Sequence, residues 1–200
     1  MRLSLRETYH GLIGIVVLLA VSGCVSISSE SEPVLLYRLS ALQQTAAEPA
    51  AVPLALALNI SSSRLLDSQR LWVMQANSRV QPLADFRWAM PAPELLRQTL
   101  IESLETAGVA VAVPSTATAG SLTLALRAMQ IEIDAAQQAQ ARISLLATWS
   151  AGDDDHSSRL FEVRHDAEIH SADSAARAMD AASQDLLSDL SVWLQDQSRR

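Results

Sequence analysis

A single cysteine, Cys24, directly follows an apolar run near the start of the chain, and this arrangement constrains the protein more than any other sequence feature. The run extends over the eleven residues from Gly11 to Val21, after a segment that carries two arginines. A helix needs about 20 residues to cross a bilayer core, so this run is too short to span one. A basic start, a short apolar run and small residues are typical of a secretory signal peptide. One cysteine also excludes an intramolecular disulfide and a cysteine-based structural zinc cluster.

The four residues Val21-Ser22-Gly23-Cys24 resemble the bacterial lipobox, with valine in place of the usual leucine. The resemblance implies a diacylglyceryl group on the thiol of Cys24, cleavage before this residue, and an N-acyl chain such as palmitate on the new amine. Several acyl chains make a stable anchor where one holds only marginally. Two alternatives stay open: a cysteine buried at the end of an N-terminal helix, and an uncut membrane anchor. In bacterial lipoproteins an Asp just after the Cys favours retention in the inner membrane, and Val25 and Ser26 stand here instead. The resemblance therefore implies the outer membrane, with the domain facing the periplasm.

Three parts are therefore expected along the chain. Residues 1–23 form the lipoprotein signal peptide, residues 24–33 the lipidated Cys24 and a tether, and residues 34–200 a periplasmic domain. Hydrophobic residues make up 49% of the chain and charged residues 18%, which is typical of a packed domain. The net charge is −7 and all 15 basic residues are arginine, without a basic stripe. Nucleic-acid binding is not expected, because it depends on neutralising phosphates.

Hydrophobic periodicity predicts an α+β fold. Strands are expected at 34–39, 54–60, 70–75, 78–83, 109–113, 122–133, 143–149 and 161–169. A hairpin is expected around Ala76 and Asn77, and the last three strands should form an antiparallel meander with a bulge near Ala128, where the apolar phase shifts. Helices are expected over 94–107 and 172–195, from their apolar stripes. The predicted fold is a mixed, largely antiparallel sheet packed against two main helices.

Motifs for catalysis or metal binding are absent from the sequence. Asp153 to Asp155 lie in an expected turn, where adjacent acids more often form a solvated loop, and their spacing does not fit an EF-hand. His165 and His170 lie five residues apart on an expected strand, so their side chains should point to opposite faces. No nucleophile elbow, phosphate loop or zinc-protease motif occurs. We expect no catalytic residue, no metal and no cofactor other than the lipid on Cys24.

The segment Phe86-Arg87-Trp88-Ala89-Met90-Pro91 has two interpretations. Its aromatic rings can fill the core, with guanidinium groups covering their edges. Alternatively, Arg87 and Trp88 can face a partner, because Trp and Arg are favoured in interface hot spots. Both interpretations remain open at the level of sequence, and Arg87 and Trp88 are the candidate partner-binding residues.

The order of these signals resembles the ABC-type transport auxiliary lipoproteins of the PqiC kind. After the lipobox, the matching features are a Tyr-containing strand at 36–39, a Leu-rich strand at 54–60, a middle segment at 66–73, and the 86–91 segment before a helix. Two departures occur. Met90 replaces a usual acid, and Ser68-Gln69 replaces a frequent Arg-Pro. The resemblance covers nearly the whole chain after Cys24.

The resemblance implies a non-enzymatic accessory of an ABC transporter that carries MCE-domain substrate-binding proteins. Such an accessory would dock the MCE assembly at the membrane that holds its acyl chains, for transport of lipids or other hydrophobic molecules between membranes. A ring-shaped partner is compatible with a homo-oligomer of this chain. Two further functions stay open. One is an outer-membrane lipoprotein for envelope assembly or maintenance, and the other is a lipoprotein hydrolase that uses His165 or one of Asp153 to Asp155.

Overall fold

The structure is a computed structural model that describes residues 35–42, 56–106, 111–112, 120–151 and 156–197. The chain divides into two compact units, Met1–Pro33 and Val34–Arg200, and all described residues belong to the second. The predicted signal peptide, Cys24 and the tether lie outside the described residues. The expected lipidation and domain boundaries therefore stay predictions.

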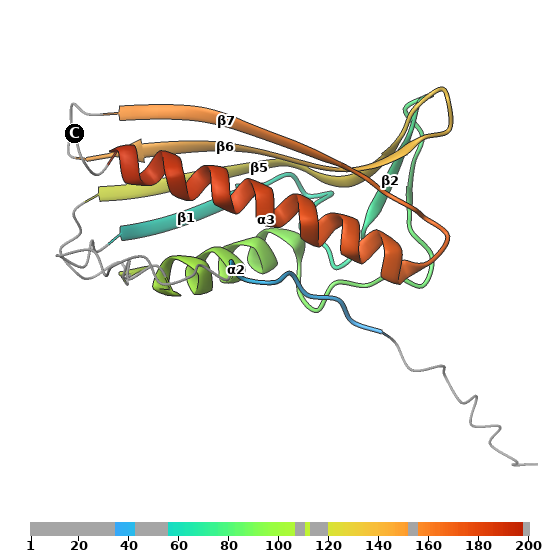
Figure 1. The fold of residues 1–200 in the computed structure, drawn as a ribbon, viewed down its shortest axis with the longest axis horizontal. Coiled ribbons are helices and arrows are strands. Elements are labelled where there is room, and N and C mark those ends of the chain that lie inside the picture. The colour runs from blue at the N-terminus through green and yellow to red at the C-terminus, as the bar shows by residue number, and fades with distance from the viewer. Residues whose placement is uncertain (1–34, 43–55, 107–110, 113–119, 152–155, 198–200) are drawn as a thin grey trace, which may run out of the picture. The chain divides into compact units, whose positions relative to one another are not determined.

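A seven-stranded mixed sheet is organised around one long strand, β5 (Gly120–Ile133). One edge of β5 pairs along its length with β6 (Ala139–Ser150), and β6 pairs with β7 (His156–Asp166). Both pairings are antiparallel and follow the chain order, as Figure 1 shows. The predicted antiparallel meander is confirmed.

The other edge of β5 is shared between two parallel partners. The first half of β5 pairs with β1 (Leu56–Ser62), and its last residues pair with β2 (Trp72–Gln75). Short strands then extend each side: β4 (Val111–Ala112) pairs with β1, and β3 (Val80–Pro82) forms a hairpin with β2. The predicted hairpin is confirmed, and its turn places Ser78 at a φ of 63°.

A β-bulge lies where the edge of β5 passes from β1 to β2. The register against β6 shifts between Leu126 and Ala128, so that Arg127 is the extra residue. Leu122, Leu124 and Leu126 are buried before the bulge, and Met129 and Ile131 are buried after it. The bulge therefore keeps apolar side chains on the core side although the alternation changes phase. The prediction of a bulge near Ala128 is confirmed.

Two helices cover one face of the sheet (Figure 1). Helix α2 (Ala92–Thr106) packs on β1 and β4, and helix α3 (Ala172–Gln197) packs on β6 and β7. Ser171 caps α3: its hydroxyl accepts from the Ser174 amide at 3.1 Å, while the Ser174 hydroxyl accepts from the Ser171 amide at 3.3 Å. This reciprocal arrangement satisfies amides that lack helical partners.

Between the helices and the sheet lies one hydrophobic core. Helix α3 contributes the predicted stripe, and all six of its members are buried: Ala175, Met179, Ala182, Leu186, Leu190 and Trp193. The buried core residues of the described chain all fall between Leu39 and Trp193. The unit Val34–Arg200 thus holds the complete described core, and the α+β architecture agrees with the sequence prediction.

The prediction of a strand over 34–39 is wrong for its described part. Residues 35–42 contain one isolated bridge, in which Tyr37 pairs with Trp88 in parallel orientation. Further along, the amides of Ser40 and Leu42 donate to side chains on the helices instead of to a neighbouring strand. The segment therefore contacts both helices and does not extend the sheet.

Candidate functional site

The two adjacent residues predicted to bind a partner differ in burial. Trp88 is fully buried, at 0% exposure, and its ring meets Phe86 edge-on with centroids 4.6 Å apart. Phe86 in turn stacks on Tyr37 at 4.6 Å. Arg87 is exposed between them. The Trp88 ring is thus part of the hydrophobic core, and partner binding at Arg87 stays a prediction.

Residues 35–42, which we name the N-terminal strap, are held by hydrogen bonds to both helices. Tyr37 donates its hydroxyl to Asp173 at 2.7 Å, and the Ser40 amide donates to Asp180 at 2.7 Å, both on α3. On α2, the hydroxyl of Ser103 accepts from the Leu42 amide at 3.0 Å. The strap therefore connects the end of the predicted tether to both helices of the domain.

The strap also has one buried apolar side chain and one tyrosine with a raised pKa. Leu39 is buried in the core at 5% exposure, whereas Leu35 and Leu36 are exposed. The hydrogen bond to Asp173 raises the pKa of Tyr37 above its ordinary value, and desolvation acts in the same direction. Tyr37 therefore stays protonated and keeps donating to α3 at neutral pH.

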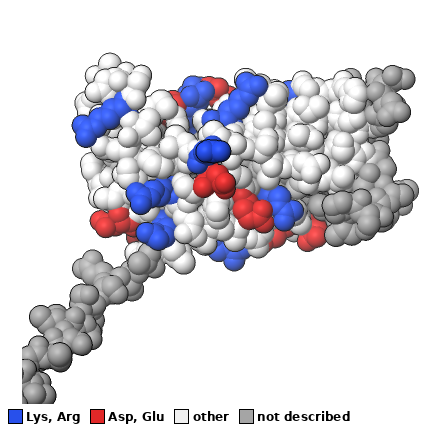
Figure 2. All heavy atoms as spheres, turned by 180° about the vertical axis from the view of Figure 1, so that it is seen from behind, with Lys and Arg blue, Asp and Glu red and all other residues white. Residues whose placement is uncertain are grey.

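No described helix covers the opposite face of the sheet, which we name the outer face. Figure 2 shows this face, where charged side chains gather over one part and the end that holds the start of β5 and the end of β6 is largely uncharged. Strand register aligns Asn59, Thr123, Thr148 and Ser158 as one row across this end. The Thr148 and Ser158 hydroxyls are hydrogen-bonded at 3.0 Å. This end thus carries a row of small polar side chains across four strands.

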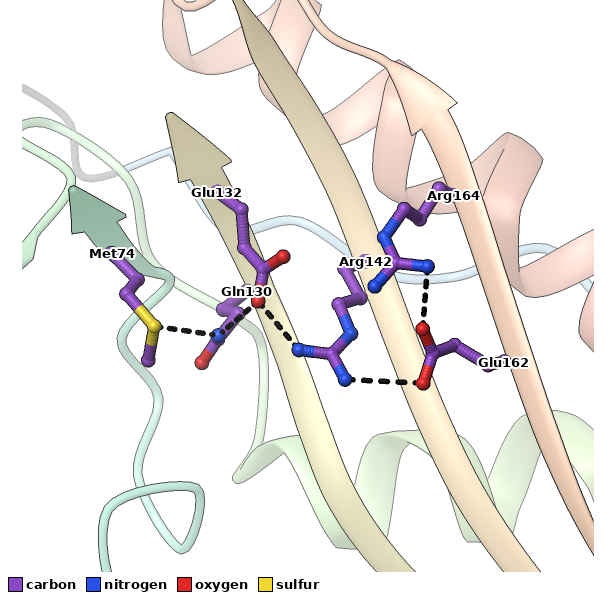
Figure 3. Close-up of polar contacts among 6 residues, drawn as sticks. All are labelled: Met74, Gln130, Glu132, Arg142, Glu162 and Arg164. Carbon is purple, nitrogen blue, oxygen red and sulfur yellow. Dashed lines mark hydrogen bonds and ion pairs between the residues drawn. The ribbon is translucent and has the colours of Figure 1, made fainter. Parts of the chain in front are cut away.

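The charged part of the outer face is an ordered network of side chains (Figure 3). Arg142 on β6 donates to Glu132 on β5 at 2.7 Å and to Glu162 on β7 at 3.1 Å. Arg164 pairs with the other oxygen of Glu162 at 2.5 Å. Gln130 donates to Glu132 at 2.9 Å. The network therefore alternates in sign across three strands and balances its own charge.

Hydrogen bonds within this network shift the pKa values of two of its members, Arg142 and Glu162. The hydrogen bond to Glu132 raises the pKa of Arg142, and the hydrogen bond from Arg142 lowers the pKa of Glu162 below its ordinary value of 4.5. One donor is left over, because Nε of Arg142 is buried without an acceptor. Arg142 and Glu162 therefore stabilise each other's charged forms, and the network keeps one unsatisfied N–H.

A cavity of about 370 Å³, which we name the bulge cavity, opens beside this network. The loop after β1 contributes Leu65 and Leu66, and the bulge contributes Arg127. Ser144 and Leu160 lie on the strands that complete its wall. Trp72 donates its indole N–H to the carbonyl of Leu65 at 2.8 Å, which fixes one rim.

The residues considered for catalysis or metal binding do not converge in the described chain. His165 on β7 pairs with Asp185 on α3, with Nε2 and Oδ2 2.6 Å apart. His170 lies after β7 rather than in it, which corrects the expected strand end. Asp153 to Asp155 and Cys24 lie outside the described residues. Among those described, no group of three or more His, Cys, Asp or Glu side chains could hold a metal ion.

Neither the strap contacts nor the bulge cavity was predicted from the sequence. The strap depends on pairs more than 60 residues apart, such as Leu42 with Ser103 and Tyr37 with Asp173. The sequence did indicate one part of the cavity, because the change in apolar alternation near Ala128 predicted the bulge. The sequence pattern did not show that Arg127 lies beside Leu65 there.

Among the described residues, no helix is both long enough and apolar enough to cross a membrane. No curated protein matches the sequence. Solved structures do match the fold. The protein XCC0632 from Xanthomonas campestris, of the family DUF330, has a TM-score of 0.70 at 21% identity and covers 83% of this chain and 99% of its own. An uncharacterised protein has a TM-score of 0.59 at 15% identity, over 78% of this chain and 99% of its own.

A family model matches residues 37–191, from the strap to the last turns of α3. The model describes the ABC-type transport auxiliary lipoprotein component. Its match includes every described strand, so it concerns the whole folded unit rather than one motif. The chain therefore belongs to the family of ABC-type transport auxiliary lipoprotein components.

Proposed function

We propose that this protein is a lipid-anchored periplasmic accessory of an ABC transporter with an MCE-domain substrate-binding protein. Lipid on Cys24 holds it at the outer membrane, and the folded domain docks the transport system there without catalysing a reaction. Lipids or other hydrophobic molecules pass between the membranes through that system. Membership of the transport auxiliary family over residues 37–191 is the observation that carries this proposal.

The placement of the strap supports an anchoring role. The predicted tether ends at residue 33, and the strap begins its contacts with the helices only a few residues later. Five polar contacts with α2 and α3 hold the strap: Tyr37–Asp173, Arg38–Glu102, Ser40–Asp180, Ser40–Gln184 and Leu42–Ser103. A pull on the lipid anchor would therefore reach both helices and, through the bridge of Tyr37 with Trp88, the segment that precedes α2.

The outer face is the docking surface in this proposal. It carries no described helix, and its uncharged end requires little desolvation of charge when another protein covers it. Interface cores are depleted in charged residues, which fits this end better than the network beside it. Arg87, which is exposed in the segment before α2, provides the competing docking site predicted from the sequence.

In-cell photo-crosslinking from the lipidated full-length protein tests the proposal. A photoreactive residue at Thr148 should capture an MCE-domain protein, and one at Val192, exposed on α3, is the matched control that should not. A third probe at Arg87 tests the competing site. Capture of an outer-membrane β-barrel at Thr148 would instead favour envelope assembly. Absence of any ABC or MCE component from both the Thr148 and the Arg87 probe would contradict the proposal.

A further inference from the structure

We propose that the bulge cavity binds a small anion carried on an apolar body, such as an alkyl carboxylate or an alkyl phosphate. The cavity is defined by its lining residues, which include Arg127, Arg142 and Ser144 as donors and Leu65 and Leu160 as apolar neighbours. This binding does not require docking to a transporter, so it can be tested on the domain alone.

Three hydrogen-bond donors line the cavity. Ser144 is only 3% exposed, and its hydroxyl is a short donor on the strand beside the bulge. The Nε–H of Arg142 is buried without a partner. Arg127 is exposed and makes no ion pair with the described part of the chain. A buried donor without an acceptor is costly, which concerns the Nε–H of Arg142. An anion with two or three oxygens could accept from this donor, from Ser144 and from Arg127.

The charge around the cavity also favours an anion. Glu132 and Glu162 are already engaged by Arg142 and Arg164, so these four charges cancel. Arg127 adds a positive charge that no described carboxylate neutralises. Hydrogen bonds between a guanidinium and a carboxylate or phosphate are roughly twice as strong as neutral ones. An uncharged ligand would leave this charge without a counterion.

Apolar side chains form the other part of the lining. Leu160 is 49% exposed and Leu65 is 39% exposed, which makes them two of the large apolar side chains left uncovered on the described surface. Leu66 and Met74 line the cavity beside them. The volume of about 370 Å³ is at the small end of the range for ligand sites, about 300–1,000 Å³. A short apolar group therefore fits better than a long chain.

The bulge explains why a cation lies at this position. An inserted residue bends the strand and redirects a side chain, and bulges are frequent beside binding sites for this reason. Arg127 is the inserted residue, and it lines the same cavity as Ser144 of the neighbouring strand. The inserted residue therefore places the Arg127 side chain in the cavity lining, beside the network of Arg142 and Glu162.

Binding can be measured by NMR on ¹⁵N-labelled residues 25–200, which contain the complete described core. Titration with octanoate below its micelle concentration should give saturable shifts at Leu65, Leu160 and the Trp72 indole, which donates to Leu65. A Trp72→Phe variant assigns that indole signal. Octyl phosphate should bind similarly, whereas octanol and inorganic phosphate should each bind at least about tenfold more weakly, since each lacks half of the recognised chemistry.

Variants locate the binding site. Arg127→Gln should weaken octanoate binding about tenfold, which is about 1.4 kcal/mol. Ser144→Ala should weaken it about threefold, and Arg87→Gln, which removes an exposed arginine outside the cavity, should not change it. Absence of saturable shifts would overturn the proposal. Equal binding of octanol or inorganic phosphate, or equal effects of Arg127→Gln and Arg87→Gln, would also overturn it.

Discussion

Replacing Trp88 by alanine should destabilise the domain far more than replacing its exposed neighbour Arg87. Trp88 is among the largest fully buried side chains, and it meets Phe86 edge-on. Truncating a buried aromatic side chain to alanine costs about 3–5 kcal/mol. Domains of this size are stable by only about 5–15 kcal/mol, so the variant should fold marginally. Arg87→Ala should change the free energy of unfolding by less than about 0.5 kcal/mol.

A second substitution at the same position separates size from hydrogen bonding. The indole nitrogen of Trp88 is buried without an acceptor. Trp88→Phe therefore loses no hydrogen bond and should cost about half as much as Trp88→Ala, or less. Urea unfolding of residues 25–200, followed by far-UV circular dichroism, gives the three free energies. A cost below about 1 kcal/mol for Trp88→Ala would refute the core assignment and return Trp88 to a surface role.

Three further changes test other parts of the structure. Gly120→Ala should cost about 1–3 kcal/mol in urea unfolding, because its Cβ would lie 2.5 Å from two ring atoms of buried Trp149. Tyr37→Phe removes the hydrogen bond between the strap and α3, which should cost about 0.5–1 kcal/mol and speed hydrogen exchange at the Ser40 amide. Glu162→Gln should reduce the loss of stability below pH 4.5, because the pKa of Glu162 is lowered in the fold and its contribution disappears as pH falls through that lowered value.

Each of these changes has a matched comparison. For Gly120→Ala, the control is the same substitution in a Trp149→Phe background, which lacks the two ring atoms that the new Cβ would meet. For Tyr37→Phe, a double-mutant cycle with Asp173→Ala isolates the contribution of the hydrogen bond between these two side chains. Glu94→Gln is the control for acid titration, because Glu94 is an exposed acid that pairs with Arg97 within one helix. Equal acid profiles for Glu162→Gln and Glu94→Gln would contradict the role of the network.

Periodicity alone located most of the secondary structure, because burial against one layer selects side chains at fixed intervals. The stripe of α3 and the alternation of Leu122, Leu124 and Leu126 were both sufficient for this. The strand expected over 34–39 failed for a related reason. Its apolar residues are equally compatible with a strap whose backbone bonds to helix side chains, and periodicity does not distinguish the two.

The sequence by itself determined the α+β class, the family, the bulge near Ala128 and the candidate lipidation site at Cys24, since each depends on local pattern or on residue order. The tertiary structure alone decided that Trp88 is buried and Arg87 exposed, that the strap joins both helices, and that Arg127 lies beside Leu65 and Ser144. These features depend on contacts between residues far apart in the chain. Such contacts are set by how the strands pair and how the layers pack, which no short stretch of sequence encodes.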